Sequence, residues 1–214
     1  MFVKDRMTKN PIVIKPETPM LEAMDRMKKA RVHRFPIVDT HHKVVGIVTE
    51  KDLVHAGPSS STTLSVYEVS SLLAKLKVSE MMTQKVLTIQ EDTPIEEAAR
   101  IMADNNIGGL PVMRGTDLVG IITESDIFKV FIEMLGSRDK GLRVSLTVNS
   151  VKGGLASIAS AVAEKGGNIL SLSTFLGQDL SQGVLVLKVD EISRADLESA
   201  LSSFVKGPLD IRET

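Results

Sequence analysis

The sequence repeats itself, and this repeat constrains the fold more than any other feature. Several short motifs of the first half return in the second half at one constant spacing, apart from a single deletion. The deletion falls in a polar turn, where changes of length are tolerated. A register kept over so many positions indicates an intragenic duplication. The matching segments are Met7-Thr8 with Met82-Thr83, Thr18-Pro19 with Thr93-Pro94, Pro36 with Pro111, and residues 46–52 with 120–126.

Each copy predicts the same order of elements, β-α-β-β-α. A short extended run precedes Thr-Pro, which suits the N-cap and the first residue of a helix. Apolar residues then recur at helical spacing, and two short apolar strands follow, joined by the polar turn. The second strand runs into Thr-Glu-x-Asp and another helix. A copy of about 50 residues is too small to bury a sufficient core alone, so we expect the two to pack together.

The last third of the chain has a different pattern of apolar residues and glycines. Residues 136–141 are polar and glycine-flanked, as in a domain linker. A strand over 142–148 follows, then a helix that opens at Gly153-Gly154 and stops at Gly166-Gly167. The remaining pattern completes βαββαβ, the ferredoxin-like order. The predicted fold class is therefore α+β, with domains at 1–64, 65–136 and 142–214.

Composition removes several classes of function. The chain has no cysteine, which excludes disulfides, thiol nucleophiles and thiolate metal sites. A net charge of −1 and an aromatic content of 3% argue against a nucleic-acid partner. No apolar run approaches the length of a membrane span, and the N-terminus has no secretory pattern. We therefore expect a soluble, cytoplasmic protein that binds neither membrane nor nucleic acid.

The Thr-Glu-x-Asp motif occurs once in each copy and supports two interpretations. Thr49 with Asp52, and Thr123 with Asp126, fit a capping box, in which threonine and aspartate bond to each other's backbone amides. The same place also suits a ligand. Amides at a helix N-terminus favour a phosphate, and an aspartate there accepts ribose hydroxyls. Both interpretations remain open from the sequence.

The two copies differ just before their first long strand. The first has His33 and Arg34, which supply donors for a phosphate. The second has Gly108 and Gly109, which supply no side chain but allow close approach of the backbone. A plainer interpretation makes His33 and Arg34 solvated residues at the end of a strand.

Two further polar segments carry weaker signals. The hydroxyl-rich loop over residues 59–63 either caps a phosphate from the side or makes local turns. His41-His42 lies in a predicted hairpin turn with no third ligand nearby in sequence, so we expect an exposed turn and no metal site.

These motifs together resemble known families. Met-Thr, Thr-Pro, the run from Arg34 to Asp39 and Gly-x-x-Thr-x-x-Asp resemble the cystathionine-β-synthase (CBS) domain, here as a tandem pair or Bateman module. The C-terminal part resembles an ACT domain, with Gly153-Gly154-Leu155 at its Gly-Leu helix start. It departs from the common Asp-x-Pro-Gly pattern at Lys152 and Gly153. The order CBS–CBS–ACT is similar to the AcuB family, named for acetoin utilisation.

The resemblance implies ligands and site residues. CBS pairs bind adenosine-containing ligands, so AMP, ADP or ATP is expected, with S-adenosylmethionine and NAD as further candidates. An effector or dimer site in the ACT-like part would use Gly153, Gly154, Leu155, Asn168 and Ile169, although a tight turn and a helix stop also explain these residues. The nucleotide-binding residues implied are Val13, His33, Arg34, Phe35, Pro36, Thr49, Asp52, Gly109, Leu110, Pro111, Thr123 and Asp126.

The sequence favours a sensor over an enzyme. It shows no nucleophile–base pair, paired carboxylates or metal cluster. We therefore expect a non-catalytic regulatory protein, a homodimer, that binds an adenine nucleotide and signals through its ACT-like part to an unidentified partner. The alternatives are a dimerisation scaffold with vestigial sites, and an accessory subunit of acetoin or acetyl-CoA metabolism, which the family name implies.

Overall fold

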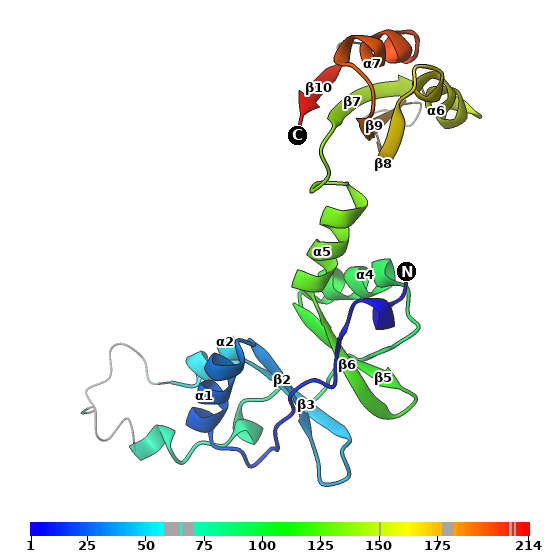
Figure 1. Ribbon diagram of the computed structural model, residues 1–214. Coiled ribbons are helices and arrows are strands. Elements are labelled where there is room, and N and C mark those ends of the chain that lie inside the picture. Colours follow the sequence, from blue (N-terminus) through cyan, green and yellow to red (C-terminus); the bar gives the residue numbers. More distant parts are fainter. Residues whose placement is uncertain (58–64, 66–70, 150, 177–181, 206, 208) are drawn as a thin grey trace. The chain divides into compact units, whose positions relative to one another are not determined.

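The computed structural model describes residues 1–57, 65, 71–149, 151–176, 182–205, 207 and 209–214. The chain divides into two compact units, Met1–Ile127 and Phe128–Thr214. Figure 1 labels their elements along the chain. The hydroxyl-rich loop over 59–63 lies outside the described residues, so its predicted role remains a prediction.

The first copy builds one half of the N-terminal unit. α1 follows Pro19 and presents Met20, Ala23 and Met27 to the interior, which is the face that the helical spacing predicts. The helix ends at Arg31 in the left-handed conformation (φ 53°). The elements are η1 (Val3–Asp5), β1 (Thr8–Lys9), α1 (Met20–Ala30), β2 (Arg34–Val38), β3 (Val44–Thr49) and α2 (Glu50–His55).

The second copy repeats this construction closely. α4 buries Ile95, Ala98 and Met102, and it ends at Asn106 with a φ of 52°. The predicted β-α-β-β-α order is therefore confirmed in the second copy. In the first copy the extended run before Thr-Pro forms only a single bridge, Ile14 with Ile37, and the remaining elements follow as predicted. The elements are η2 (Val78–Glu80), β4 (Ile89–Gln90), α4 (Ile95–Asn105), β5 (Gly109–Arg114), β6 (Asp117–Thr123) and α5 (Glu124–Met134).

The short segment that leads into each copy docks on the other copy. The Val3 amide donates to the Thr93 carbonyl at 2.9 Å, and the Val78 amide donates to the Thr18 carbonyl at 3.0 Å. β1 then pairs antiparallel with β6, which gives the sheet order β1-β6-β5-β4. Thr83 bridges to Ile47 of β3 in the same way. Each copy thus completes the sheet of its neighbour, which explains how two small halves share one stable unit.

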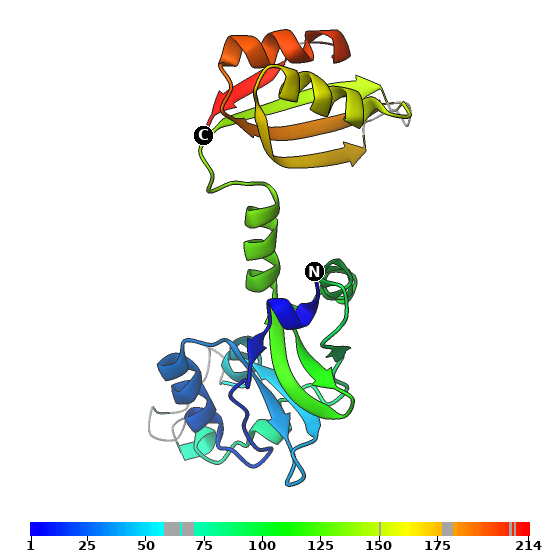
Figure 2. The ribbon, with the colours of Figure 1, turned by 45° about the vertical axis from the view of Figure 1, so that its right-hand side comes forward.

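The C-terminal unit confirms the ferredoxin-like order βαββαβ. Its sheet has the antiparallel order β10-β7-β9-β8. Figure 2 shows α6 and α7 on the same face of this sheet, where Ile158, Val162, Leu197 and Leu201 join the strand side chains in one core. The elements are β7 (Leu142–Asn149), α6 (Gly154–Glu164), β8 (Asn168–Leu176), β9 (Gln182–Asp190), α7 (Arg194–Leu201), η3 (Ser202–Phe204) and β10 (Asp210–Glu213).

One helix belongs to both units. α5 begins at Glu124 in the N-terminal unit and ends at Met134 in the C-terminal one, because the division falls after Ile127. The chain reaches the C-terminal unit through this helix rather than through the polar residues 136–141 alone.

Candidate functional site

A cavity of about 600 Å³ lies where the two copies meet. The first copy contributes His33 just before β2, Arg34 at the start of β2, and Thr49 to Asp52 from the end of β3 and the first turn of α2. The second copy contributes Gly108, Gly109 and Glu124. The cavity therefore gathers the sequence-predicted residues His33, Arg34, Thr49, Asp52 and Gly109.

The Thr-Glu-x-Asp motif forms a capping box in the first copy. The Thr49 amide and hydroxyl both donate to Oδ2 of Asp52 at 2.8 Å, and the Asp52 amide donates to the Thr49 hydroxyl at 3.2 Å. In the second copy, the Thr123 amide and hydroxyl donate to Oδ2 of Asp126 at 3.0 and 2.7 Å. The motif thus fixes the start of each helix. In the first copy these bonds leave Oδ1 of Asp52 for another partner.

His33 pairs with the residue that begins α2. Its Nδ1 lies 2.7 Å from Oε2 of Glu50, and both side chains are largely exposed. The Glu50 amide also donates a hydrogen bond to the His33 carbonyl at 2.9 Å. These contacts tie the end of the strand to the helix, and an exposed pair of this kind contributes little to stability.

Arg34 is the one half-buried guanidinium on the cavity wall. Within the part of the chain that the structure describes, it has neither a hydrogen-bond partner nor an ion pair, whereas Arg100 and Arg114 each bind carboxylates. Burial lowers the pKa of Arg34, and the nearby carboxylate of Glu124 counteracts this by raising it. A partly desolvated cation without a bonded partner favours an anion in the cavity.

The paired glycines of the second copy make room for Arg34. A Cβ atom on Gly108 would lie 2.8 Å from an Arg34 guanidinium nitrogen, and a Cβ on Gly109 would clash with the same group. The guanidinium therefore lies against the backbone of Gly108 and Gly109. The packing of an arginine from the other copy against these glycines was not predicted from the sequence.

Two lysines that were not predicted from the sequence also line the cavity. Lys51 lies inside the first Thr-Glu-x-Asp motif, and Lys85 follows Met82-Thr83. The position of Lys51 within the motif was a usable signal. No sequence signal marked Lys85, because it reaches the cavity only when the segment that leads into the second copy docks on the first copy.

Several predicted residues lie elsewhere in the N-terminal unit. Phe35 and Leu110 are fully buried in the core, and Pro36 and Pro111 are buried beside them in β2 and β5. Val13 is half-buried next to the buried Ile14. Thr123 and Asp126 hold the start of α5 and do not line this cavity.

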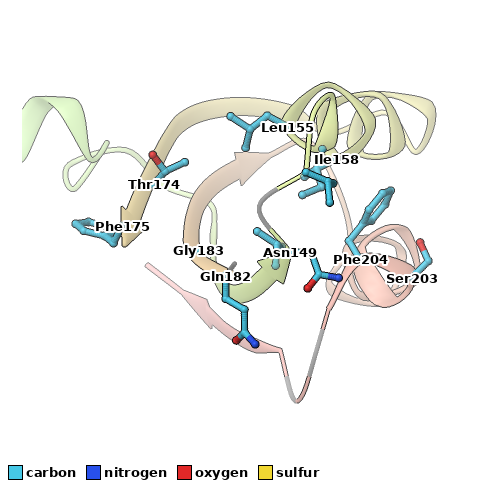
Figure 3. A pocket seen from close by; sticks show the side chains of 12 residues that line it. Asn149, Leu155, Ile158, Thr174, Phe175, Gln182, Gly183, Ser203 and Phe204 are labelled. Carbon is cyan, nitrogen blue, oxygen red and sulfur yellow. The ribbon is translucent and has the colours of Figure 1, made fainter. Parts of the chain in front are cut away.

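A second pocket, of about 500 Å³, lies at one end of the C-terminal unit. Figure 3 shows Leu155 and Ile158 of α6 with Asn149, Gln182 and Phe204 around it. Gly154 also lines the pocket, and the neighbouring Gly153 adopts φ 79°, which glycine allows without strain. The lining residues given by the structure are uncharged.

The structure does not bring Asn168 and Ile169 to this pocket. Asn168 pairs with Asp190, and its side chain donates to Oδ1 of Asp190 at 2.9 Å. The pocket instead lies where Asn149 pairs with Gln182, at the other end of β9. Asn168 therefore lies at the opposite end of the sheet from Gly153 and Gly154, because α6 returns the chain to that end. The use of these residues in an effector or dimer site stays a prediction.

The family model of the CBS domain matches residues 3–59 and 78–133. The chain belongs to the CBS-domain family. Its tandem CBS pair forms the N-terminal unit and includes α5 up to residue 133. The matched residues end before β7, so the family match does not include the ferredoxin-like unit, and its identity as an ACT domain stays a prediction.

Relatives of the CBS pair include proteins that are little more than such a pair. A CBS domain-containing protein of Dictyostelium discoideum is 33% identical over 136 residues, which are 63% of this chain and 94% of the relative. A protein from Vibrio cholerae, described as an acetoin utilization protein (AcuB), is 31% identical with a TM-score of 0.53. That similarity covers 65% of this chain and 96% of the other.

Two similar solved structures hold adenosine compounds. The CBS pair of protein MJ0100, in complex with 5′-methylthioadenosine and S-adenosyl-L-methionine, is 32% identical with a TM-score of 0.52, over 65% of this chain and 98% of that one. The protein CBSX2, in complex with AMP, is 27% identical with a TM-score of 0.50, over 61% and 96%. Homologous CBS pairs thus bind adenosine-type ligands.

The described residues contain no group of three or more His, Cys, Asp or Glu side chains placed to hold a metal ion. No helix in the same part of the chain is long and apolar enough to cross a membrane.

Proposed function

We propose that this protein is a non-catalytic sensor that binds an adenine nucleotide in the cavity between its CBS copies. The observation that carries the proposal is Arg34, a half-buried guanidinium without a bonded partner on the cavity wall. Homologous CBS pairs bind AMP and S-adenosyl-L-methionine, which supports an adenosine-type ligand. The unpartnered arginine favours the phosphorylated member of that class.

The proposed roles follow from the geometry. Arg34 takes the phosphate in a bidentate bond, and the exposed ammonium groups of Lys51 and Lys85 add attraction. Asp52 accepts a ribose hydroxyl through Oδ1, since the capping bonds use Oδ2. No helix N-terminus is needed for the phosphate, because the amides of Glu50 and Asp52 in the first turn of the six-residue α2 already donate to the His33 carbonyl and the Thr49 hydroxyl. Thr123 and Asp126 have a structural role in this scheme.

The C-terminal unit is the proposed output of the sensor. The pocket beside Gly154 and Leu155 is the proposed effector site, and its uncharged lining does not favour a free amino acid. β8 forms one edge of the sheet, where backbone groups are available to a second copy of the chain. Pairing at this edge would give the proposed homodimer and would carry the response to a regulated protein.

A thermal-shift screen tests the proposal. The compounds are AMP, ADP, ATP, adenosine, S-adenosylmethionine, NAD and a set of amino acids. A ligand present at 100 times its Kd contributes about 2.7 kcal/mol to stability, so AMP should raise the Tm of the wild type clearly. The rise should shrink in Asp52→Ala and persist in Asp126→Ala.

The screen also separates the alternatives. A dimerisation scaffold with vestigial sites predicts no shift with any adenosyl compound, and that result would overturn the proposal. An accessory role in acetoin or acetyl-CoA metabolism, which the likeness to the Vibrio cholerae protein favours, predicts co-purification with an enzyme of that metabolism.

A further inference from the structure

Arg34 and Glu124 meet at a place that also holds the start of α5. The absent Cβ of Gly108 marks this place: a Cβ built there would lie 2.8 Å from an Arg34 nitrogen and 2.8 Å from Oε2 of Glu124. The two charged groups therefore flank the same small gap. They attract each other, since Glu124 raises the pKa of Arg34 against the effect of burial.

Glu124 is the first residue of α5, and its backbone is bound to the same glycine. The Glu124 amide donates to the Gly108 carbonyl at 3.2 Å. Gly108 thus anchors the first turn of α5 through its backbone and accommodates Arg34 through its missing side chain. Any movement of Arg34 away from Gly108 changes the surroundings of this turn.

The first copy has no such arrangement. Glu50, the counterpart of Glu124, pairs directly with His33 of its own copy at 2.7 Å. Its helix, α2, ends at His55. α5 continues to Met134, beyond the division between the two units. Among the described residues, only the Glu124 end of the cavity therefore leads along a helix into the C-terminal unit.

We propose that a phosphate bound in the cavity draws Arg34 away from Glu124 and thereby loosens the first turn of α5, so that α5 carries the ligand signal toward the C-terminal unit. This inference rests on the proposed nucleotide site. The cause is electrostatic: the Glu124 carboxylate exchanges a neighbouring cation for a neighbouring anion, so attraction becomes repulsion. Coupling of this kind is reciprocal, since ligand and helix must each bias the same two states.

The test combines titration calorimetry with hydrogen exchange on the full chain, with AMP as the probe. AMP should speed exchange of the α5 amides in the wild type by about fivefold or more, the lower end of usual coupling factors. Glu124→Gln, which removes the negative charge, should bind AMP more tightly by a similar factor and should lose the α5 response. The matched control is Glu50→Gln, which should keep the α5 response.

A second variant covers the case in which Glu124→Gln does not fold. Gly108→Ala fills the gap between Arg34 and Glu124 and so displaces Arg34 before any ligand binds. It should therefore bind AMP no more weakly than the wild type and should abolish the α5 response. AMP binding to the wild type without any change in α5 exchange would overturn this inference alone. A full α5 response in Glu124→Gln or Gly108→Ala would do the same. No AMP binding to the wild type would overturn the proposed site, and this inference with it.

Discussion

The two CBS copies share a backbone and differ in chemistry where they meet. α1 and α4 both span 11 residues and end in a left-handed residue, and both copies have the same capping pair. At the meeting point, however, the first copy carries His33-Arg34 and the second carries Gly108-Gly109. The Arg34 guanidinium occupies the space at Gly109, its own counterpart position. Two arginines would compete for this space, so only one copy can carry the cation.

The comparison teaches which features a duplication must preserve. Helix ends, caps and core positions recur because each half needs them to fold. The residues at the junction are free to diverge, and here their divergence turns a symmetric frame into one asymmetric cavity. Substitutions in the shared core and caps should therefore change stability, whereas substitutions where the copies meet should also change ligand binding.

The largest effect is expected at the preserved core. Phe35 and Leu110 occupy equivalent, fully buried positions. Phe35→Ala should lower the free energy of unfolding by about 3–5 kcal/mol, and Leu110→Ala by about 2–5 kcal/mol, because each leaves a cavity. Urea unfolding of the full chain, followed by circular dichroism, measures both.

The matched control for these variants is Val54→Ala. Val54 is 57% exposed, so its loss should change stability by no more than about 0.5 kcal/mol. If Phe35→Ala had an equally small effect on stability, Phe35 would not be the core residue that the structure shows.

The next largest effect on stability is expected at Gly109, where the two copies meet. A Cβ on Gly109 would meet Arg34 and would lie 3.0 Å from the Ile122 carbonyl oxygen. Gly109→Ala should therefore cost about 1–3 kcal/mol of stability through overpacking. A double-mutant cycle checks the cause: the cost should fall clearly in an Arg34→Ala background. Equal costs in both backgrounds would show that Arg34 does not occupy this space.

Substitutions of Asp52 and Asp126 should distinguish a capping role from a role in ligand binding. Asp52→Ala and Asp126→Ala each remove a capping interaction, which should lower stability by about 1 kcal/mol in both cases. Titration calorimetry with AMP should distinguish them, since only Asp52 lines the cavity. Equal AMP affinities in the two variants would remove Asp52 from the binding site.

The smallest effect concerns an exposed ion pair of the second copy. Hydrogen bonding to Arg114 holds the pKa of Glu91 below its ordinary value of 4.5. A lowered pKa in the folded state means that the ionised carboxylate stabilises the fold, and this contribution disappears as the pH falls through that lowered pKa. The Tm of Glu91→Gln should thus be slightly below wild type at pH 7, and the difference should shrink as the pH falls below the usual pKa of the carboxyl group. A difference that persisted in acid would have another cause.

The repeat made most of the fold predictable. Periodicity placed α1 and α4, and glycine pairs placed both ends of α6, because these signals are local. Thr-Pro marked the two helix starts one residue early, since Pro19 and Pro94 are the N-caps and the helices begin at the next residue. The docking of Val3 on Thr93, and of Val78 on Thr18, carries no local signal, since it depends on how the copies fit together.

The site was predictable in part for the same reason. His33, Arg34, Thr49 and Asp52 lie close together in one copy, and the structure gathers them. Lys85 reaches the cavity only because the segment that leads into the second copy docks on the first copy. Phe35 and Leu110 were chosen by resemblance, and their complete burial places them in the core, where large apolar side chains usually lie.

The central claim is that Arg34 is the receptor for the phosphate of an adenine nucleotide. Titration calorimetry with AMP and with adenosine, on the wild type and on Arg34→Ala, tests it most directly. The wild type should prefer AMP over adenosine by about ten- to a hundredfold, the usual range for a hydrogen bond to a charged group, and Arg34→Ala should lose this preference. Equal binding of AMP and adenosine by the wild type, or an unchanged preference in Arg34→Ala, would contradict the claim.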